Sequence, residues 1–170
     1  VTLIKRRNNA RETLSGVDVQ LRKRHDLVPN VLALAKRFME HEKGLLEQVT
    51  ALRTKATAPY NEADPAAVKQ HLAAESQLSG AFGKLMVNME AYPDLKSDST
   101  MLEAQNTYRD VEANIAAARR FYNSTVKELN NAVEIFPGSL VAGIVGVKAM
   151  PFFEETDEAV RAPVSAADHL

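Results

Sequence analysis

The feature that most constrains the fold is a run of apolar residues, spaced three and four apart, over residues 101–136. The run begins at Met101 and ends at Phe136, directly before Pro137. This spacing puts the apolar side chains on one face of an α-helix. A helix of that length, about 57 Å at the standard rise, needs long neighbours to bury its stripe. The sequence therefore predicts antiparallel partner helices, as in a bundle or a coiled-coil hairpin.

Two further regions carry the same spacing. The first runs from about residue 2 to residue 56 and contains Pro29, which lacks the amide that an interior helical residue donates. We therefore expect a kink or a break near residues 26–28. The second starts with Pro65 after an aspartate N-cap and ends near residue 91. With a short helix at about residues 139–147, the prediction is an all-α antiparallel bundle of three long helices, the first broken near Pro29, plus a short carboxyl-terminal helix.

Composition and charge set the domain organisation. Residues 1–153 are predicted to form one helical domain, and residues 154–170 an acidic carboxyl-terminal tail. The chain has no cysteine, which excludes disulfides and cysteine-based metal sites. Residues 1–57 carry twelve Lys and Arg against six Asp and Glu. This basic end suggests contact with an anionic partner, either a phospholipid surface or a nucleic acid, and a solvated helix face is the alternative.

Motifs that carry chemistry are missing from the sequence. His41 precedes Glu42, but no second histidine follows at the spacing of the HExxH zinc motif. The chain has no GxSxG, no ExxH, no glycine-rich phosphate loop and no dinucleotide fingerprint. We therefore predict a protein that is not an enzyme, with no catalytic residues, no metal site, no cofactor and no small-molecule substrate.

A line of polar residues runs beside the apolar stripe of the long third helix. Amide and guanidinium groups at a helix seam need buried partners, and such pairs can fix the register of long helices. We predict one structural polar network between the first and third helices, with a ligand groove as the alternative. Its expected members are Asp18, Asp26, Asn30, Arg119, Asn123 and Asn130.

Four segments resemble the LemA family in content and in order. They are VDVQLRKRHDLVPNVL (17–32), MEHEKGLLEQVTALRTKA (39–56), LMVNMEAYPDLKSD (85–98) and ARRFYNSTVKELNNAVEIFPGSLVA (118–142). The similarity covers about residues 8–153, and the combination of DLVPN, AYPDLK, RRFYN and IFPG is specific. The resemblance implies a bacterial, mainly helical protein of poorly defined role, with one membrane anchor before the first basic helix. We expect such an anchor to precede Val1 in the native protein.

Basic residues near the amino terminus are the predicted lipid-surface contacts. The positive-inside tendency would place this end at the cytoplasmic side of a bacterial inner membrane. A nucleic acid has less support, because no aromatic residues interleave the basic run. For the run at residues 22–25 the alternative is a solvated helix turn, with Arg24 paired to Asp18 or Asp26. The predicted contacts are Lys5, Arg6, Arg7, Arg11, Arg22, Lys23 and Arg24.

The predicted function is a non-catalytic, membrane-associated scaffold or protein-interaction domain of the bacterial envelope. It would be single-pass, would face the cytoplasm, and would associate with copies of itself or with other proteins, and not with nucleic acid. The alternative is a peripheral lipid-surface or membrane-remodelling module that uses the basic first helix. Met150, Phe152 and Phe153 would either dock on the bundle or form an exposed partner site.

Overall fold

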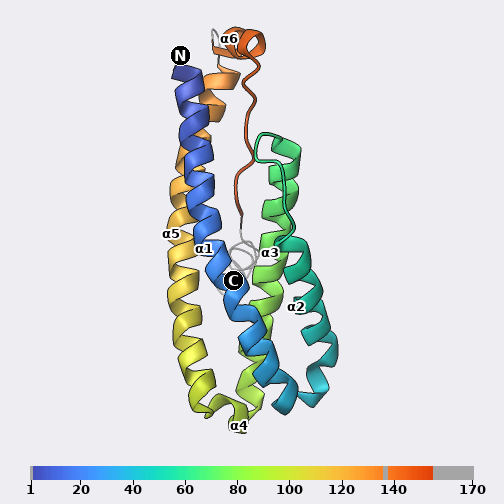
Figure 1. The fold of residues 1–170 in the computed structure, drawn as a ribbon. Helices are drawn as coiled ribbons and strands as arrows, with labels where there is room; N and C mark the ends of the chain where they lie inside the picture. Colours follow the sequence, from blue (N-terminus) through green and yellow to red (C-terminus); the bar gives the residue numbers. More distant parts are fainter. Residues whose placement is uncertain (1, 136–137, 155–170) are drawn as a thin grey trace, which may run out of the picture.

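The computed structural model describes residues 2–135 and 138–154, and this part of the chain is helical without strands. Four helices, α1 (Thr2–Phe38), α2 (Lys43–Ala56), α3 (Pro65–Asn88) and α5 (Ser99–Glu134), alternate in direction along an elongated rod (Figure 1). The 3-10 turns η1 (Glu40–Glu42) and η2 (Met89–Ala91) and the short α4 (Pro93–Lys96) reverse the chain at one end. Helix α6 (Gly138–Val145) lies at the other end, beside the amino terminus. The predicted all-α bundle is confirmed.

The rod has two hydrophobic cores in series along its length. One core joins α1, α2 and α3 to the start of α5 and includes Leu27 and Leu78. The other joins the first half of α1 and the start of α3 to the middle and end of α5, and includes Leu21 and Leu72. Because α2 and α3 are shorter than α1 and α5, the segment after α6 runs back along the second core (Figure 1).

Of the two alternatives predicted for Pro29, a kink or a break, the break is wrong. Helix α1 continues through Pro29 to Phe38, and Figure 1 shows it bending along its length. The chain instead leaves the helical conformation at Met39, where φ is −108° and ψ is 63°. The Met39 side chain is buried in the first core, so tertiary packing places this turn where the sequence has no proline or glycine breaker.

Capping groups fix the ends of the helices around the second core. Asp64 accepts a hydrogen bond from the amide of Ala66 at 3.1 Å, which confirms the expected N-cap of α3. At the end of α6, Gly146 adopts a φ of +73°, and the amide of Val147 donates to the carbonyl of Ala142 at 3.0 Å. This Schellman-type turn needs a residue that tolerates the left-handed conformation, which explains the glycine.

Candidate functional site

A layer of buried charges lies between the two cores. Arg24 of α1 is fully buried and donates from Nε and Nη2 to the two carboxylate oxygens of Glu112 of α5, at 2.9 and 2.7 Å. Its Nη1 lies 3.6 Å from Oε2 of Glu75 of α3, which is also fully buried. On α1, Arg24 falls between Leu21 of one core and Leu27 of the other. The fork of Arg24 thus ties three helices together at one level of the rod.

Two further contacts of His25 extend this layer, one to α3 and one to α2. Nε2 of His25 pairs with Oε1 of Glu75. The carbonyl of His25 accepts a hydrogen bond at 2.8 Å from Nε of Arg53. In an uninterrupted helix this carbonyl would accept the amide of residue 29, and Pro29 has none. Arg53 supplies a donor in its place, which compensates the His25 carbonyl for the amide that Pro29 lacks.

A second polar cluster surrounds Asp18 of α1. Its Oδ1 lies 3.0 Å from Nε2 of His71 of α3, and its Oδ2 accepts a hydrogen bond at 2.5 Å from the Tyr60 hydroxyl. The rings of Tyr60 and His71 stack with their centroids 4.0 Å apart. Burial raises the pKa of Tyr60, and the hydrogen bond to the Asp18 carboxylate raises that pKa further. Both oxygens of Asp18 are therefore taken by the protein's own side chains.

The Asp18 cluster borders a polar cavity of about 400 Å³. His25 and Arg53 line the same cavity. An imidazole held by a carboxylate is a possible proton carrier. Here, however, the polar groups converge on one another, so the arrangement favours a structural role.

Apart from Arg119, the residues of the predicted polar network fall into separate groups in the structure. Asp18 belongs to the cluster with Tyr60 and His71, whereas Asp26 and Asn30 are exposed on α1. Arg119 is buried in α5. Asn123 and Asn130 bind the segment after α6 instead of α1. The buried layer between the helices is formed by other residues.

The predicted lipid contacts are also divided, and the assignment of Arg24 is wrong. Arg24 is buried in the charged layer, where no lipid reaches it. Arg22 and Lys23 are exposed, but they lie roughly 20 Å along α1 from the first basic turns at 1.5 Å per residue. The remaining four, Lys5, Arg6, Arg7 and Arg11, lie on the first three turns of α1, at the end that carries α6.

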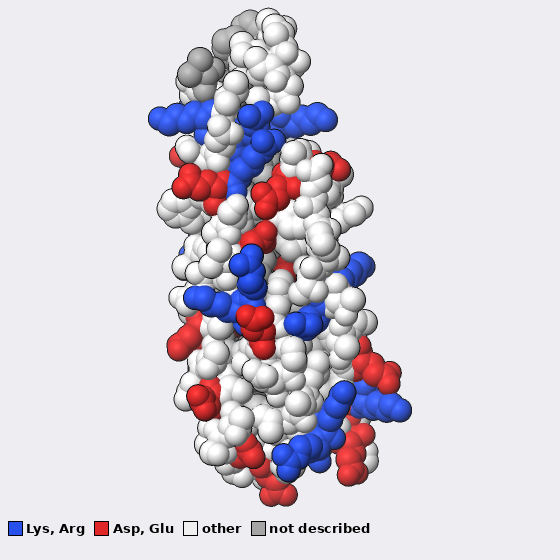
Figure 2. Space-filling model, viewed as in Figure 1, with Lys and Arg blue, Asp and Glu red and all other residues white. Residues whose placement is uncertain are grey.

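This basic end is visible as a band of blue side chains directly beneath an uncharged tip (Figure 2). Lys5 is exposed, and Nη1 of Arg6 donates to the carbonyl of Glu128 at 3.4 Å. Arg7, Arg11 and Lys148 line one cavity of about 170 Å³. Cations from both ends of the described chain therefore meet at the same level of the rod.

The tip consists of α6, whose outer face is apolar. Leu140 and Ile144 expose 62% and 77% of their surface, and Val141 and Val145 are also exposed. Ala142 is buried against the second core and holds the helix in place. Apolar side chains gathered outward on one short helix indicate a contact surface.

The segment after α6 is held by two asparagines of α5. Asn123 exchanges hydrogen bonds with the amide and carbonyl of Phe153, at 2.8 and 2.9 Å. Asn130 does the same with Met150, at 2.9 and 3.0 Å. Seven residues of helix and three residues of extended chain both span about 10 Å, so the two amides match the backbone. Met150 and Phe153 are buried, which confirms docking for these two residues, whereas Phe152 is exposed.

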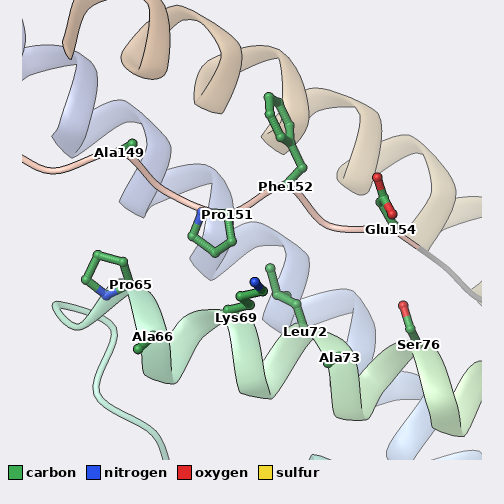
Figure 3. Close-up of a pocket in the computed structure, with 10 residues that line it drawn as sticks. All are labelled: Pro65, Ala66, Lys69, Leu72, Ala73, Ser76, Ala149, Pro151, Phe152 and Glu154. Atoms are coloured by element: carbon green, nitrogen blue, oxygen red, sulfur yellow. The ribbon is translucent and has the colours of Figure 1, made fainter. Parts of the chain in front are cut away.

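An open cavity of about 770 Å³ lies between this segment and α3 (Figure 3). Pro151 points toward Lys69 and Leu72 of α3, whereas Phe152 points away from that helix (Figure 3). The walls are mainly apolar, with Lys69 and Glu154 as the charged groups. We assign this cavity no ligand.

Sequence reasoning missed several residues of the charged layer. A signal was available for Glu75, which falls on the apolar stripe of α3 between Leu72 and Leu78. An acidic residue at a buried stripe position calls for a buried cation. Nothing comparable indicated Arg53 or Tyr60, because their partners are set by the packing of α2 and the following loop on α1.

Two features that would indicate a metalloprotein or a membrane span are absent from the described residues. These residues contain no group of three or more His, Asp or Glu side chains that could hold a metal ion. Within residues 2–135 and 138–154, no helix combines the length and hydropathy needed to cross a bilayer.

Comparison with known proteins identifies relatives of the chain. The model of the LemA family matches residues 13–166. The magnetosome protein MamQ of Magnetospirillum gryphiswaldense is 32% identical over 92 residues, which are 54% of this chain and 34% of the relative. The magnetosome protein MamQ 2 of Paramagnetospirillum magneticum is 24% identical over 161 residues, with 83% of this chain and 59% of the relative covered. The chain thus spans between about a third and three fifths of these relatives' length.

Proposed function

Because the chain belongs to the LemA family, we propose that it is a non-catalytic scaffold domain that works at a bacterial membrane. The observation that carries the proposal is the gathering of cations beside an exposed apolar helix at one end of the rod. Basic side chains of this kind are attracted to anionic lipid at about 1 kcal/mol per charge. The relatives named as magnetosome proteins support a bacterial setting for this chain.

The non-catalytic part of the proposal rests on how the buried charges are used. Arg24, Glu75 and Glu112 pair with one another at the junction of the helices. Asp18 is engaged by Tyr60 and His71. Groups that satisfy each other across helices specify register and rigidity, which a scaffold needs.

We further propose that the domain is attached by a single apolar anchor on its amino-terminal side and faces the cytoplasm. The basic first turns of α1 favour the cytoplasmic side of the inner membrane. They also lie at the end of the rod that an anchor preceding α1 would bring to the bilayer (Figure 1). The long axis of the bundle would then project from the membrane.

The surface for protein partners is the outer groove between α1 and α5. This groove, of about 710 Å³, is lined by Gly16 of α1 and by Ala117 and Phe121 of α5. Phe121 exposes 65% of its surface beside these small residues. If two copies pair through this groove, Phe121 of each copy can pack beside Gly16 and Ala117 of the other, as a two-fold contact requires.

Flotation with vesicles tests the membrane part of the proposal. Binding to vesicles of phosphatidylcholine and phosphatidylglycerol should weaken about 25-fold when Lys5→Gln and Arg6→Gln are combined, at about fivefold per charge. The matched control is Lys36→Gln with Arg37→Gln, which removes two charges from the opposite end of α1 and should change binding little. Equal effects of the two pairs would contradict a lipid-facing end.

The same vesicles separate the scaffold from the second candidate function, a peripheral lipid-surface module. That candidate is favoured by the apolar face of α6. Both candidates should bind anionic vesicles at low salt. At physiological salt a peripheral module should stay tightly bound without any anchor, whereas the binding of a scaffold without its anchor should weaken strongly, because salt screens surface charges.

Cysteine cross-linking tests the protein-facing groove. The chain has no cysteine of its own, so a single introduced thiol reports one contact. Gly16→Cys places it at an open position in the groove, where no heavy atom lies within 4 Å of an added Cβ. Dimers should form on membranes with Gly16→Cys and not with Thr54→Cys on the exposed face of α2. Absence of dimers in both variants would contradict self-association through this groove.

A further inference from the structure

We propose that α6 inserts into the bilayer as an apolar wedge, and that the cavity beside Arg7, Arg11 and Lys148 holds the phosphate of an anionic phospholipid. The inference rests on the proposed function, since both place this end of the rod at a membrane. It adds the ligand, the inserting element and the residues of the binding site.

The exposed face of α6 is suited to the acyl region of a bilayer. Ile144 and Leu140 are among the most exposed large apolar side chains of the described chain. No charged residue occurs between Gly138 and Val147. The helix is held in place, because Ala142 and Val147 are buried and the amide of Val147 donates a hydrogen bond to the carbonyl of Ala142, across the turn that Gly146 makes. Water is thus in contact with a fixed apolar surface that a bilayer would cover.

The cavity beside α6 has the chemistry of a phosphate site. It measures about 170 Å³ and is lined by three cations, Arg7, Arg11 and Lys148, against one carboxylate, Glu62. The Nε of Arg7 is buried and has no hydrogen-bond partner within the described part of the chain. A buried guanidinium donor without an acceptor is costly unless a ligand supplies one. Phosphate oxygens match the donor fork of arginine, which favours this ligand.

The order of the two features along the rod favours a lipid over a free phosphate ion. Only Gly146 and Val147 separate α6 from Lys148, so the apolar helix and the cationic cavity are adjacent. A phospholipid has the same order, with acyl chains followed directly by the phosphate. A soluble ion would leave the exposed face of α6 uncovered. Charge and apolar surface together therefore identify one ligand.

Tryptophan fluorescence tests the insertion of α6. The chain has no tryptophan, so Ile144→Trp reports from this position alone. Added vesicles of phosphatidylcholine and phosphatidylglycerol should shift its emission to the blue, and brominated acyl chains should quench it. The control is Leu102→Trp, which reports from an exposed residue at the opposite end of α5 and should not respond. An unchanged Ile144→Trp spectrum in fully vesicle-bound protein overturns insertion while leaving membrane association standing.

Charge removal tests the phosphate site. Combining Arg7→Gln, Arg11→Gln and Lys148→Gln should weaken vesicle binding about 100-fold, at about fivefold per charge. The matched control, Arg22→Gln, Lys23→Gln and Lys36→Gln, removes three exposed cations further along α1 and should cost less than about fivefold. A charge-conserving pair, Arg7→Lys with Arg11→Lys, should still bind less tightly than the native chain, because lysine lacks the donor fork. Equal losses in the two triple variants overturn the site.

A third arm distinguishes the lipid from the free ion. Inorganic phosphate at millimolar concentration should neither bind the soluble domain measurably by calorimetry nor displace it from vesicles. Binding of inorganic phosphate that depends on Arg7, together with unaltered vesicle binding of the triple variant, would show an ion site and overturn the lipid site. The result for Lys5 and Arg6 would then decide the membrane proposal separately.

Discussion

The hydrogen bond from Arg53 to the carbonyl of His25 allows a test of how α1 remains helical around Pro29. If Arg53 replaces the missing amide of Pro29, its contribution should depend on whether residue 29 can donate. Arg53→Met leaves the His25 carbonyl without this donor. Pro29→Ala restores a backbone amide at the right position, so the two substitutions should interact.

The magnitude follows from the geometry of the contact. A hydrogen bond from a charged donor contributes about 1.5 to 3 kcal/mol, and the 2.8 Å bond from Arg53 lies at the short end of the usual range. Arg53 is half-buried, so part of this contribution is lost to solvent. We expect Arg53→Met to lower the free energy of unfolding by about 1 to 2 kcal/mol with Pro29 present. In the Pro29→Ala background the loss should fall to about 0.5 kcal/mol, a coupling of about 1 kcal/mol.

Urea denaturation of the four proteins of the cycle, followed by far-ultraviolet circular dichroism, measures this coupling. Exposed Arg109 provides the control, because Arg109→Met should change stability by less than about 0.5 kcal/mol in both backgrounds. Independent sites add within about 0.3 to 0.5 kcal/mol. A coupling no larger than that between Pro29→Ala and Arg53→Met would refute the replacement of the amide by the arginine.

Three further predictions concern buried groups. Arg24→Met should lower the free energy of unfolding by about 3 to 5 kcal/mol, because its carboxylate partners stay buried without a cation. Chemical denaturation should show that adding Glu112→Met restores much of the lost stability. The pKa of Tyr60 is raised in the folded state, so Tyr60 of the unfolded chain ionises first as the pH rises above about 10. The free energy of unfolding should therefore fall as the pH rises above that value. Tyr60→Phe should make this fall smaller in melting curves measured at alkaline pH. Asn130→Leu should cost about 2 kcal/mol for its two hydrogen bonds and speed amide exchange at Met150, whereas Asn131→Leu on the exposed face should not.

The fold class could be predicted because the spacing of apolar residues within each helix is a local property of the sequence. The positions at which the helices end were harder to predict. Pro29 is a strong local signal, but its effect is cancelled by Arg53, which is 24 residues further along the chain and becomes a neighbour only when α2 packs on α1. Met39 gives no local signal, since its burial in the core is a property of the assembled bundle.

The polar residues illustrate the same limit. Asn123 and Asn130 were correctly singled out as side chains that need partners, yet spacing alone could not say which partner. Their spacing of seven matches a second helix and also matches three residues of extended chain. The structure selects the second possibility. Arg24 was interpreted as a surface residue because it belongs to a continuous basic run. In the structure, helical rotation buries Arg24, whereas Arg22 and Lys23 are exposed.

These partners link the bundle to its proposed membrane end. Lys148 lies between the closed end of α6 at Gly146 and the clamp that Asn130 forms on Met150. Both fixed points are two residues away, so the backbone of Lys148 has little freedom to leave the cavity that it shares with Arg7. The asparagine clamp would therefore act on the proposed lipid site without touching it. If the proposed membrane contact is correct, a scaffold built in this way would transmit the rigidity of its second core to the tip at the bilayer.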